Sequence, residues 1–265
     1  AIWAGHLDGS LTHFDGHRFR TLTINEKNKE AITGIAEDKD GRIWVSTAGD
    51  GAWKLGDIPE EGAAIPAEPY GESKGLRTKL LGVTALRDGR LCFVEDGAGV
   101  RYLENGAAKD LPLPGVQGVF RISAMFQDGK GNVWVGTQGG GAYRINDEGN
   151  GRVDRFDITN GMRSNTVYCF GEDGQGNVWA GTIDGGATVI GGTAPRTYYT
   201  DNGLHSRFVR CVVRDREGNL LIGTNDSGLD IFKGDRFVSY GEADGLNDPK
   251  VFAVMEDRNG RTWFG

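Results

Sequence analysis

Long hydrophobic runs are missing from this sequence. Apolar residues make up 38% of its 265 residues and come in short stretches. No segment approaches the roughly 18 consecutive apolar residues that a membrane-spanning helix needs, so we expect no direct membrane contact. The sequence also lacks an initiator Met and a signal-peptide hydrophobic region, and it opens on the strand-like Ala1-Ile2-Trp3-Ala4. We therefore expect it to belong to a longer product.

Cysteine and histidine are scarce as well, and acidic residues outnumber basic ones, 37 to 30. The cysteines, Cys92, Cys169 and Cys211, are odd in number and lack metal-ligand spacing, which argues against a disulfide framework. The four histidines also lack such spacing, since His13 and His17 flank a predicted hairpin turn, and no metal or cofactor is expected. The formal net charge of −7 argues against a nucleic-acid-binding surface.

Glycine, in contrast, is abundant, and the chain repeats itself. Its 44 glycines separate short apolar runs, which is typical of short strands joined by tight turns. A repeat of roughly 42 residues covers the whole sequence. Its anchor lies within a short strand and is a tryptophan or another apolar residue; the anchors are Trp3, Trp44, Cys92, Trp134, Trp179, Leu221 and Trp263.

Each repeat contains four extended runs. In the clearest copy they cover residues 208–213, 220–224, 229–232 and 236–240, with glycine-containing turns between them. Four hairpin-connected strands per repeat are the signature of a propeller blade. We therefore predict an all-β fold, a single β-propeller domain over residues 1–265 with four-stranded antiparallel blades. Six blade equivalents are present, which fit either a six-bladed ring with terminal overlap or an incomplete seven-bladed ring.

The first strand of each repeat is expected to be the innermost, because both of its faces are largely apolar and one position is restricted to small residues. That position holds Gly34, Ala124, Cys169, Cys211 and Ala253. We interpret the two cysteines there as small buried hydrophobic residues rather than reactive thiols.

Two features that recur in most repeats are interpreted as structural. The aspartates of the first hairpin resemble the start of a calcium-binding loop, but the rest of such a loop is absent, and Asp in a tight turn ordinarily bonds its own backbone. These aspartates are Asp38, Asp128, Asp173, Asp215 and Asp257. The tryptophans are predicted to pack between neighbouring blades.

The motifs resemble those of a known repeat family. Glu172-Asp173-Gly174-Gln175-Gly176-Asn177-Val178-Trp179 recurs with variations, and a motif such as Asn202-Gly203-Leu204 precedes the first strand of four blades. In this order they resemble the two-component regulator propeller repeat. The resemblance implies a seven-bladed propeller, often two in tandem, that forms the extracytoplasmic sensor of a membrane histidine kinase. It thus implies a periplasmic or extracellular location and a membrane-anchored parent chain.

Functional residues are expected where the blades differ, on the loops around the channel mouth. The loops between the second and third strands and those between blades are predicted to lie at the same end of each blade. The candidate ligand-binding residues on these loops are Arg77, Arg163, Asp184, His205, Arg207 and Asp226. Interspersed carboxylates and arginines suit a small polar ligand, an oligosaccharide, an acidic ligand or a protein partner.

Catalytic motifs are not found: the sequence has no GxSxG elbow, no HExxH and no phosphate-binding loop before a helix. We therefore predict a non-catalytic sensory propeller. One alternative is an enzyme resembling the streptogramin lyase propellers, with metal-assisted acid–base chemistry at His205 and Asp226 or at His6 and Asp8. Another is a purely protein-docking scaffold.

Overall fold

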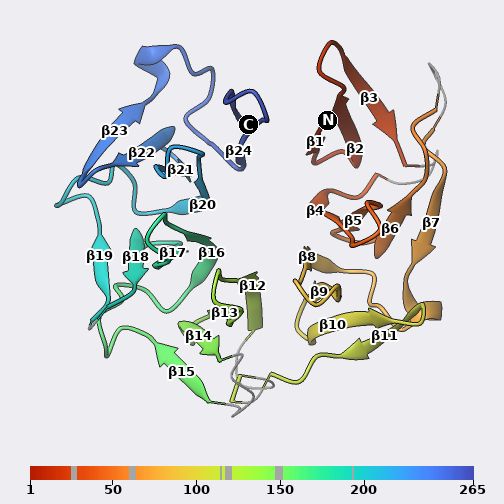
Figure 1. Ribbon diagram of the computed structural model, residues 1–265, viewed down its shortest axis with the longest axis horizontal. Helices are drawn as coiled ribbons and strands as arrows, with labels where there is room; N and C mark the ends of the chain where they lie inside the picture. Colours follow the sequence, from red (N-terminus) through yellow and green to blue (C-terminus); the bar gives the residue numbers. More distant parts are fainter. Residues whose placement is uncertain (25–28, 60–63, 114, 117–120, 147–151, 193) are drawn as a thin grey trace. The chain divides into compact units, whose positions relative to one another are not determined.

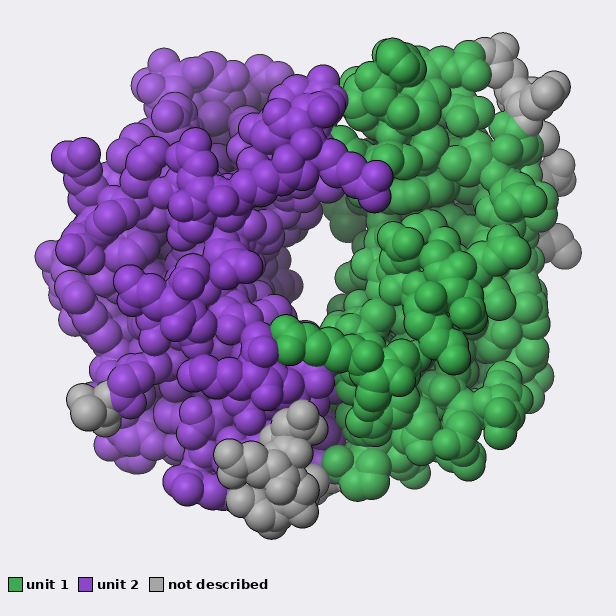
Figure 2. All heavy atoms as spheres, viewed as in Figure 1, with its two compact units in different colours: residues 1–112 green, residues 113–265 purple. Residues whose placement is uncertain are grey.

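The computed structural model describes residues 1–24, 29–59, 64–113, 115–116, 121–146, 152–192 and 194–265. They form two compact units, residues 1–112 and 113–265 (Figure 2), and each unit is described by itself. The prediction of one domain over the whole chain stays a prediction.

Unit 1 contains one three-stranded and two four-stranded antiparallel sheets (Figure 1). The three-stranded sheet consists of β1 (Ile2–Gly5), β2 (Ser10–Phe14) and β3 (Phe19–Thr23). The next consists of β4 (Ile32–Glu37), β5 (Ile43–Thr47), β6 (Ala52–Leu55) and β7 (Ala67–Tyr70). The last consists of β8 (Leu80–Ala85), β9 (Leu91–Glu95), β10 (Gly99–Glu104) and β11 (Ala107–Asp110).

Unit 2 contains three four-stranded sheets and one two-stranded sheet (Figure 1). The first consists of β12 (Arg121–Gln127), β13 (Val133–Gln138), β14 (Ala142–Ile145) and β15 (Val153–Phe156). The second consists of β16 (Val167–Glu172), β17 (Val178–Thr182), β18 (Ala187–Ile190) and β19 (Arg196–Tyr198). The third consists of β20 (Val209–Arg214), β21 (Leu220–Thr224), β22 (Leu229–Lys233) and β23 (Arg236–Tyr240), and the pair is β24 (Val254–Glu256) and β25 (Thr262–Phe264).

Every sheet is a meander in which consecutive strands pair antiparallel. The predicted fold class, an all-β propeller of four-stranded antiparallel blades, is confirmed. The described residues contain only two helices, the single 3₁₀ turns η1 (Glu72–Lys74) and η2 (Glu242–Asp244). None of the described helices is long and apolar enough to span a membrane.

The first strands of consecutive sheets lie against each other within each unit: β4 against β8, and β12, β16, β20 and β24 in series. This agrees with the predicted innermost position. Val167, Val209 and Val251 on or beside these strands are buried. Cys169 and Cys211, however, are partly exposed rather than fully buried, and each directly follows a register shift in its strand. Burial still raises the pKa of the Cys211 thiol to about 11.

The hairpin aspartates bond their own turns. In the clearest case Asp173 Oδ1 accepts the N–H groups of Gln175 and Asn177, both at 2.9 Å, and Oδ2 accepts the indole N–H of Trp179 at 3.1 Å. The same indole bond forms at Asp38, Asp128 and Asp257. The interpretation as structural turns is confirmed, and the bond to the tryptophan, which lies six residues further on, adds a link between turn and core.

The tryptophans pack against the next blade, as predicted. Trp134 shares a cluster with Val167 and Phe170 of the following sheet. Trp179 shares one with Val209 and Val212 of β20. The inter-blade loops add a further apolar residue to these clusters: Leu76, Met162 and Leu204 are all buried there.

The hairpin aspartates predict a loss of stability in acid. Burial alone would raise the pKa of Asp173, but the bonds from Asn177, Trp179 and Gln175 outweigh it and lower the pKa. A carboxylate with a lowered folded-state pKa stabilises the fold above its unfolded-state value of about 4, and this stabilisation is lost as the pH falls towards the folded-state value.

We expect Asp173→Asn to lower the unfolding free energy by about 1–3 kcal/mol at pH 7 and by much less at pH 2. Urea unfolding followed by circular dichroism from pH 7 to pH 2 measures both values. A variant whose stability falls with pH as steeply as that of the wild type would contradict this account.

Candidate functional site

Two kinds of loop meet at the same end of a blade, as predicted. Backbone hydrogen bonds join the loop between the second and third strands to the loop that leads into the next blade. The N–H of Gly51 donates to Thr78, that of Gly186 to Arg207 and that of Gly228 to Pro249, at 2.7–2.8 Å. In these three blades the polar residues of both loops therefore share one end, here named the loop end.

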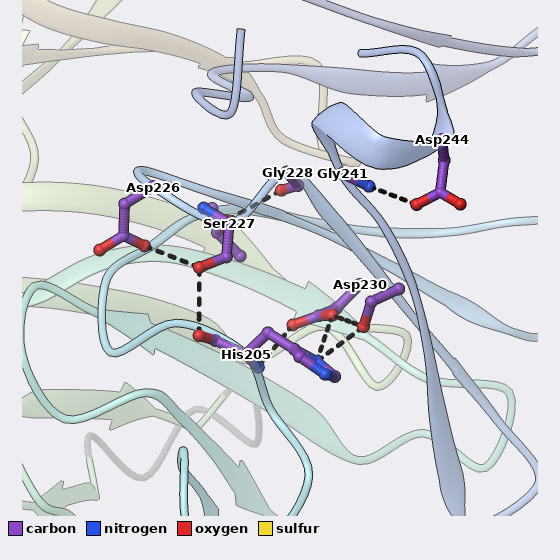
Figure 3. A network of polar contacts seen from close by, with 9 residues as sticks. His205, Asp226, Ser227, Gly228, Asp230, Gly241 and Asp244 are labelled. Atoms are coloured by element: carbon purple, nitrogen blue, oxygen red, sulfur yellow. Dashed lines mark hydrogen bonds and ion pairs between the residues drawn. The ribbon is translucent and has the colours of Figure 1, made fainter.

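His205 is the centre of a polar network at the loop end of the β20–β23 blade (Figure 3). Its backbone N–H donates to Asp230 Oδ2 at 2.9 Å, and its ring Nδ1 lies 3.0 Å from Asp230 Oδ1. Ser239 Oγ lies 2.6 Å from the same Nδ1 and also donates to Asp230. Asp230 and Ser239 face each other across β22 and β23, so the strand register holds the imidazole in place.

The network orients one ring nitrogen but does not form a nucleophilic triad. Asp230 is fully buried, whereas the His205 side chain is 55% exposed. In a Ser-His-Asp triad the serine and the carboxylate meet opposite ring nitrogens. Here Asp230 and Ser239 both approach Nδ1. The arrangement therefore presents an oriented imidazole to solvent, suited to hydrogen bonding a ligand.

Asp226 lies on the loop next to His205 but does not bond its ring. Ser227 Oγ lies 3.1 Å from the carbonyl oxygen of His205 and 3.2 Å from Asp226 Oδ1 (Figure 3). The structure thus brings these two predicted residues onto adjoining loops. The carboxylate that pairs with the imidazole is Asp230 rather than Asp226, because Asp226 is held at the exposed turn.

The other predicted residues of unit 2 separate into two groups. The guanidinium of Arg163 pairs with Asp201 at 2.9 Å and lies 4.5 Å from the ring centre of Tyr199, so neighbouring loop residues already engage it. Arg207 and Asp184 have exposed side chains on loops that the bond between Gly186 and Arg207 joins. These last two remain accessible to a ligand.

In unit 1, Arg77 bonds a buried carboxylate. Its backbone N–H donates to Glu95 Oε1 at 2.8 Å, and the Nε atoms of Arg77 and Arg101 lie 3.8 and 3.5 Å from Oε2. Glu95 is buried and thus anchors this loop.

Elsewhere in unit 1 the ring of His6 bonds Thr12 at 2.7 Å, while Asp8 bonds Ser10. The predicted ring of charges across all blades stays a prediction.

Asp230 and Ser239 escaped the sequence analysis, although a signal existed. Asp230 interrupts the apolar run Leu229-Asp230-Ile231-Phe232, and a charge inside a strand needs a buried partner. The residues at the equivalent position of the other complete sheets are Trp53, Arg101, Tyr143 and Thr188. Among the described residues, no group of three or more His, Cys, Asp or Glu side chains is arranged to hold a metal ion.

The network also predicts a difference in stability between its two aspartates. Asp230→Ala should lower the unfolding free energy by about 1–3 kcal/mol, because His205 N–H and Ser239 lose a buried acceptor. Asp226→Ala, at an exposed turn, should change it by no more than about 0.5 kcal/mol. Urea unfolding of both variants measures this, and equal effects would refute the anchoring role of Asp230.

Four segments of the chain match the family model described as two component regulator propeller: residues 27–49, 117–139, 161–184 and 203–226. Each segment contains the first and second strands of one blade. The resemblance found in the motifs is thereby confirmed. No curated protein matches this chain in sequence.

Solved structures share the fold at low sequence identity. The extracellular domain of a protein described as a hybrid two component system from B. thetaiotaomicron is 18% identical, with a TM-score of 0.63 over 99% of this chain and 47% of its own. PorZ, a surface component of the type-IX secretion system of Porphyromonas gingivalis, is 15% identical (TM-score 0.73; 99% of this chain, 43% of its own). A streptogramin B lyase is 14% identical, with a TM-score of 0.71 over 99% of this chain and 85% of its own. This chain spans less than half the length of the first two.

Proposed function

Because this chain carries two-component regulator propeller repeats, we propose that it is a non-catalytic recognition domain, the sensory part of a bacterial signalling receptor. Similarity of fold to an extracellular domain described as part of a hybrid two component system supports this proposal. The proposal includes a periplasmic or extracellular location and a membrane-anchored parent chain. It assigns ligand or partner binding to the loop ends of the blades.

One observation carries the proposal: the residues that repeat serve the fold, while those at the loop ends differ from blade to blade. The hairpin aspartates and tryptophans are bound to each other in four copies. In contrast, the residue that follows the shared Thr at the end of the second strand is of a different type in four blades: Ala48, Gln138, Ile183 and Asn225. Binding surfaces on repeat scaffolds are built from such variable positions.

A thermal-shift screen tests the proposal. The protein is heated with neutral and acidic oligosaccharides and small organic acids, and the screen is repeated with His205→Ala and with Asp235→Ala, an exposed control in the β22–β23 turn. We expect at least one ligand to raise the melting temperature of the wild type and of Asp235→Ala, but less that of His205→Ala. If no compound binds while a protein partner is captured at the loop end, the docking-scaffold alternative is favoured.

The lyase alternative rests on a different observation, the oriented imidazole of His205. The streptogramin B lyase has the same fold over 85% of its own length, and the Asp230 contact fixes His205 Nδ1. Incubation with a streptogramin B antibiotic followed by mass spectrometry tests this alternative. Conversion that disappears in His205→Ala would support an enzyme, and no conversion would leave the recognition domain as the better account.

A further inference from the structure

One residue in the first strand of each complete blade sits at a β-bulge. The register shifts there by one residue, between Val167 and Cys169 in β16 and between Val209 and Cys211 in β20. Bulges bend the strand, redirect a side chain and often lie beside functional sites. The bulge residues are Thr33, Leu81, Ser123, Tyr168 and Arg210.

Phe252 holds the corresponding place in front of β24. The N–H groups of Phe252 and Ala253 both donate to the carbonyl oxygen of Gly265, at 2.6 and 3.0 Å. Phe252 and Ala253 therefore both lie opposite the single residue Gly265, as two residues lie opposite one in the other bulges. Three consecutive blades of unit 2 thus present Tyr168, Arg210 and Phe252 from equivalent positions.

Three aromatic rings, those of Tyr168, Phe252 and Phe208, surround the Arg210 guanidinium. The Arg210 guanidinium carbon lies 5.1 Å from the ring centre of Tyr168, 4.8 Å from that of Phe252 and 4.2 Å from that of Phe208. Tyr168 and Phe252 are nevertheless 40% and 50% exposed. One cation and several accessible ring faces thus form a single surface, here named the Arg210 cluster.

Arg210 is held in place but keeps donors free. Its Nε and one terminal nitrogen donate to Asn225 Oδ1 at 3.0 and 2.5 Å, and the other terminal nitrogen donates to the Tyr168 hydroxyl at 3.0 Å. These bonds use three of the five N–H groups of a guanidinium. Among the described residues, no carboxylate pairs with Arg210.

The fold itself does not require large side chains at this position. In β12 the bulge residue is Ser123, whose hydroxyl donates to the carbonyl oxygen of Val167 at 2.6 Å. In β4 it is Thr33, whose hydroxyl lies 2.9 Å from that of Ser46. A small hydroxyl residue bonded within the scaffold is thus sufficient. Exposed aromatic rings around an unpaired cation point to a ligand instead.

We propose that the Arg210 cluster binds a carboxylate carried on a ring, either an aromatic acid or an acidic sugar. The free guanidinium N–H groups bind the planar carboxylate. The faces of Tyr168 and Phe252 cover the apolar face of the ring that carries it. This inference deepens the proposed function, on which it rests for the biological role of the ligand.

Isothermal titration calorimetry of the intact chain tests the inference. The probes are benzoate and glucuronate, and the neutral controls are benzyl alcohol and glucose. Arg210→Met removes the cation, and Arg236→Met removes one positive charge from exposed β23 of the same sheet. We expect at least one acid to bind, Arg210→Met to weaken it by about ten-fold or more, and Arg236→Met to leave it unchanged. The acid that binds identifies the source of the carboxylate.

Three results would overturn the inference: neither acid binds at up to about 10 mM, the neutral analogues bind equally well, or Arg210→Met binds like the wild type. If Arg210→Met fails to fold, Arg210→Lys and Phe252→Leu replace it, and both should weaken binding. If neither acid binds but another ligand binds in a way that depends on His205, only this inference is refuted. Acid binding at Arg210 without any response of the parent receptor would refute only the proposed function.

Discussion

Trp179→Ala is expected to lower the free energy of unfolding by about 3–5 kcal/mol. Trp179 is 1% exposed and stacks parallel on Tyr198, with ring centres 5.2 Å apart. It also contacts Phe232 at 5.0 Å and donates its indole N–H to Asp173. Truncation therefore opens a cavity between two blades and removes one of the donors to the hairpin carboxylate. Urea unfolding followed by fluorescence and circular dichroism measures the loss.

Two variants separate the causes of this effect. Trp179→Phe keeps most of the packing and removes the indole bond, so it should cost about 1–2 kcal/mol. Phe264→Ala, at a residue that is 48% exposed, should cost less than about 1 kcal/mol. A loss below about 1 kcal/mol for Trp179→Ala would mean that blade-to-blade packing does not depend on the repeated tryptophan.

Gly228→Ala is expected to destabilise the chain by more than about 3 kcal/mol. Gly228 has φ +78°, and an added Cβ would stand well inside van der Waals contact with the carbonyl oxygen of Tyr240. The same backbone arrangement occurs at Gly186, whose N–H also bonds the next loop. The penalty thus combines a strained backbone conformation with a clash. The clash is difficult to relieve, because the atoms that the new Cβ would meet belong to the backbone rather than to a flexible side chain.

Gly218→Ala is the matched control in the same sheet. Gly218 has φ +88° but no atom within 4 Å of an added Cβ, so only the conformational cost of about 1 kcal/mol applies. Chemical unfolding of the two variants side by side isolates the clash. Equal losses would show that the loop between β21 and β22 relaxes freely, contrary to the packed loop end described above.

The strand pattern could be predicted because it is local. The runs 220–224 and 236–240 coincide with β21 and β23, since apolar residues and turn glycines mark both ends of each run. The bond between Asp173 and Trp179 was not predicted. Their six-residue separation brings the carboxylate to the indole only once the hairpin register is known.

The candidate site was less accessible to prediction because it depends on register and on distant contacts. His205 meets Asp230 across 25 residues and Ser239 across 34. Arg210 reaches Tyr168, 42 residues earlier, from a bulge that alternation of apolar and polar residues does not reveal. The meeting of the two kinds of loop at one end of a blade was predicted correctly, since it follows from the meander alone.

The central claim is that ligand recognition uses the variable residues at the loop end and the bulges, while the repeated residues only build the blades. Amide ¹H–¹⁵N correlation spectra of the chain, titrated with aromatic acids and with neutral and acidic sugars, test it most directly. We expect shifts at residues 205–210 and 225–227 and none at the hairpin residues 173–177 and 215–219. Shifts confined to those hairpins, or no shift with any of the compounds, would contradict it.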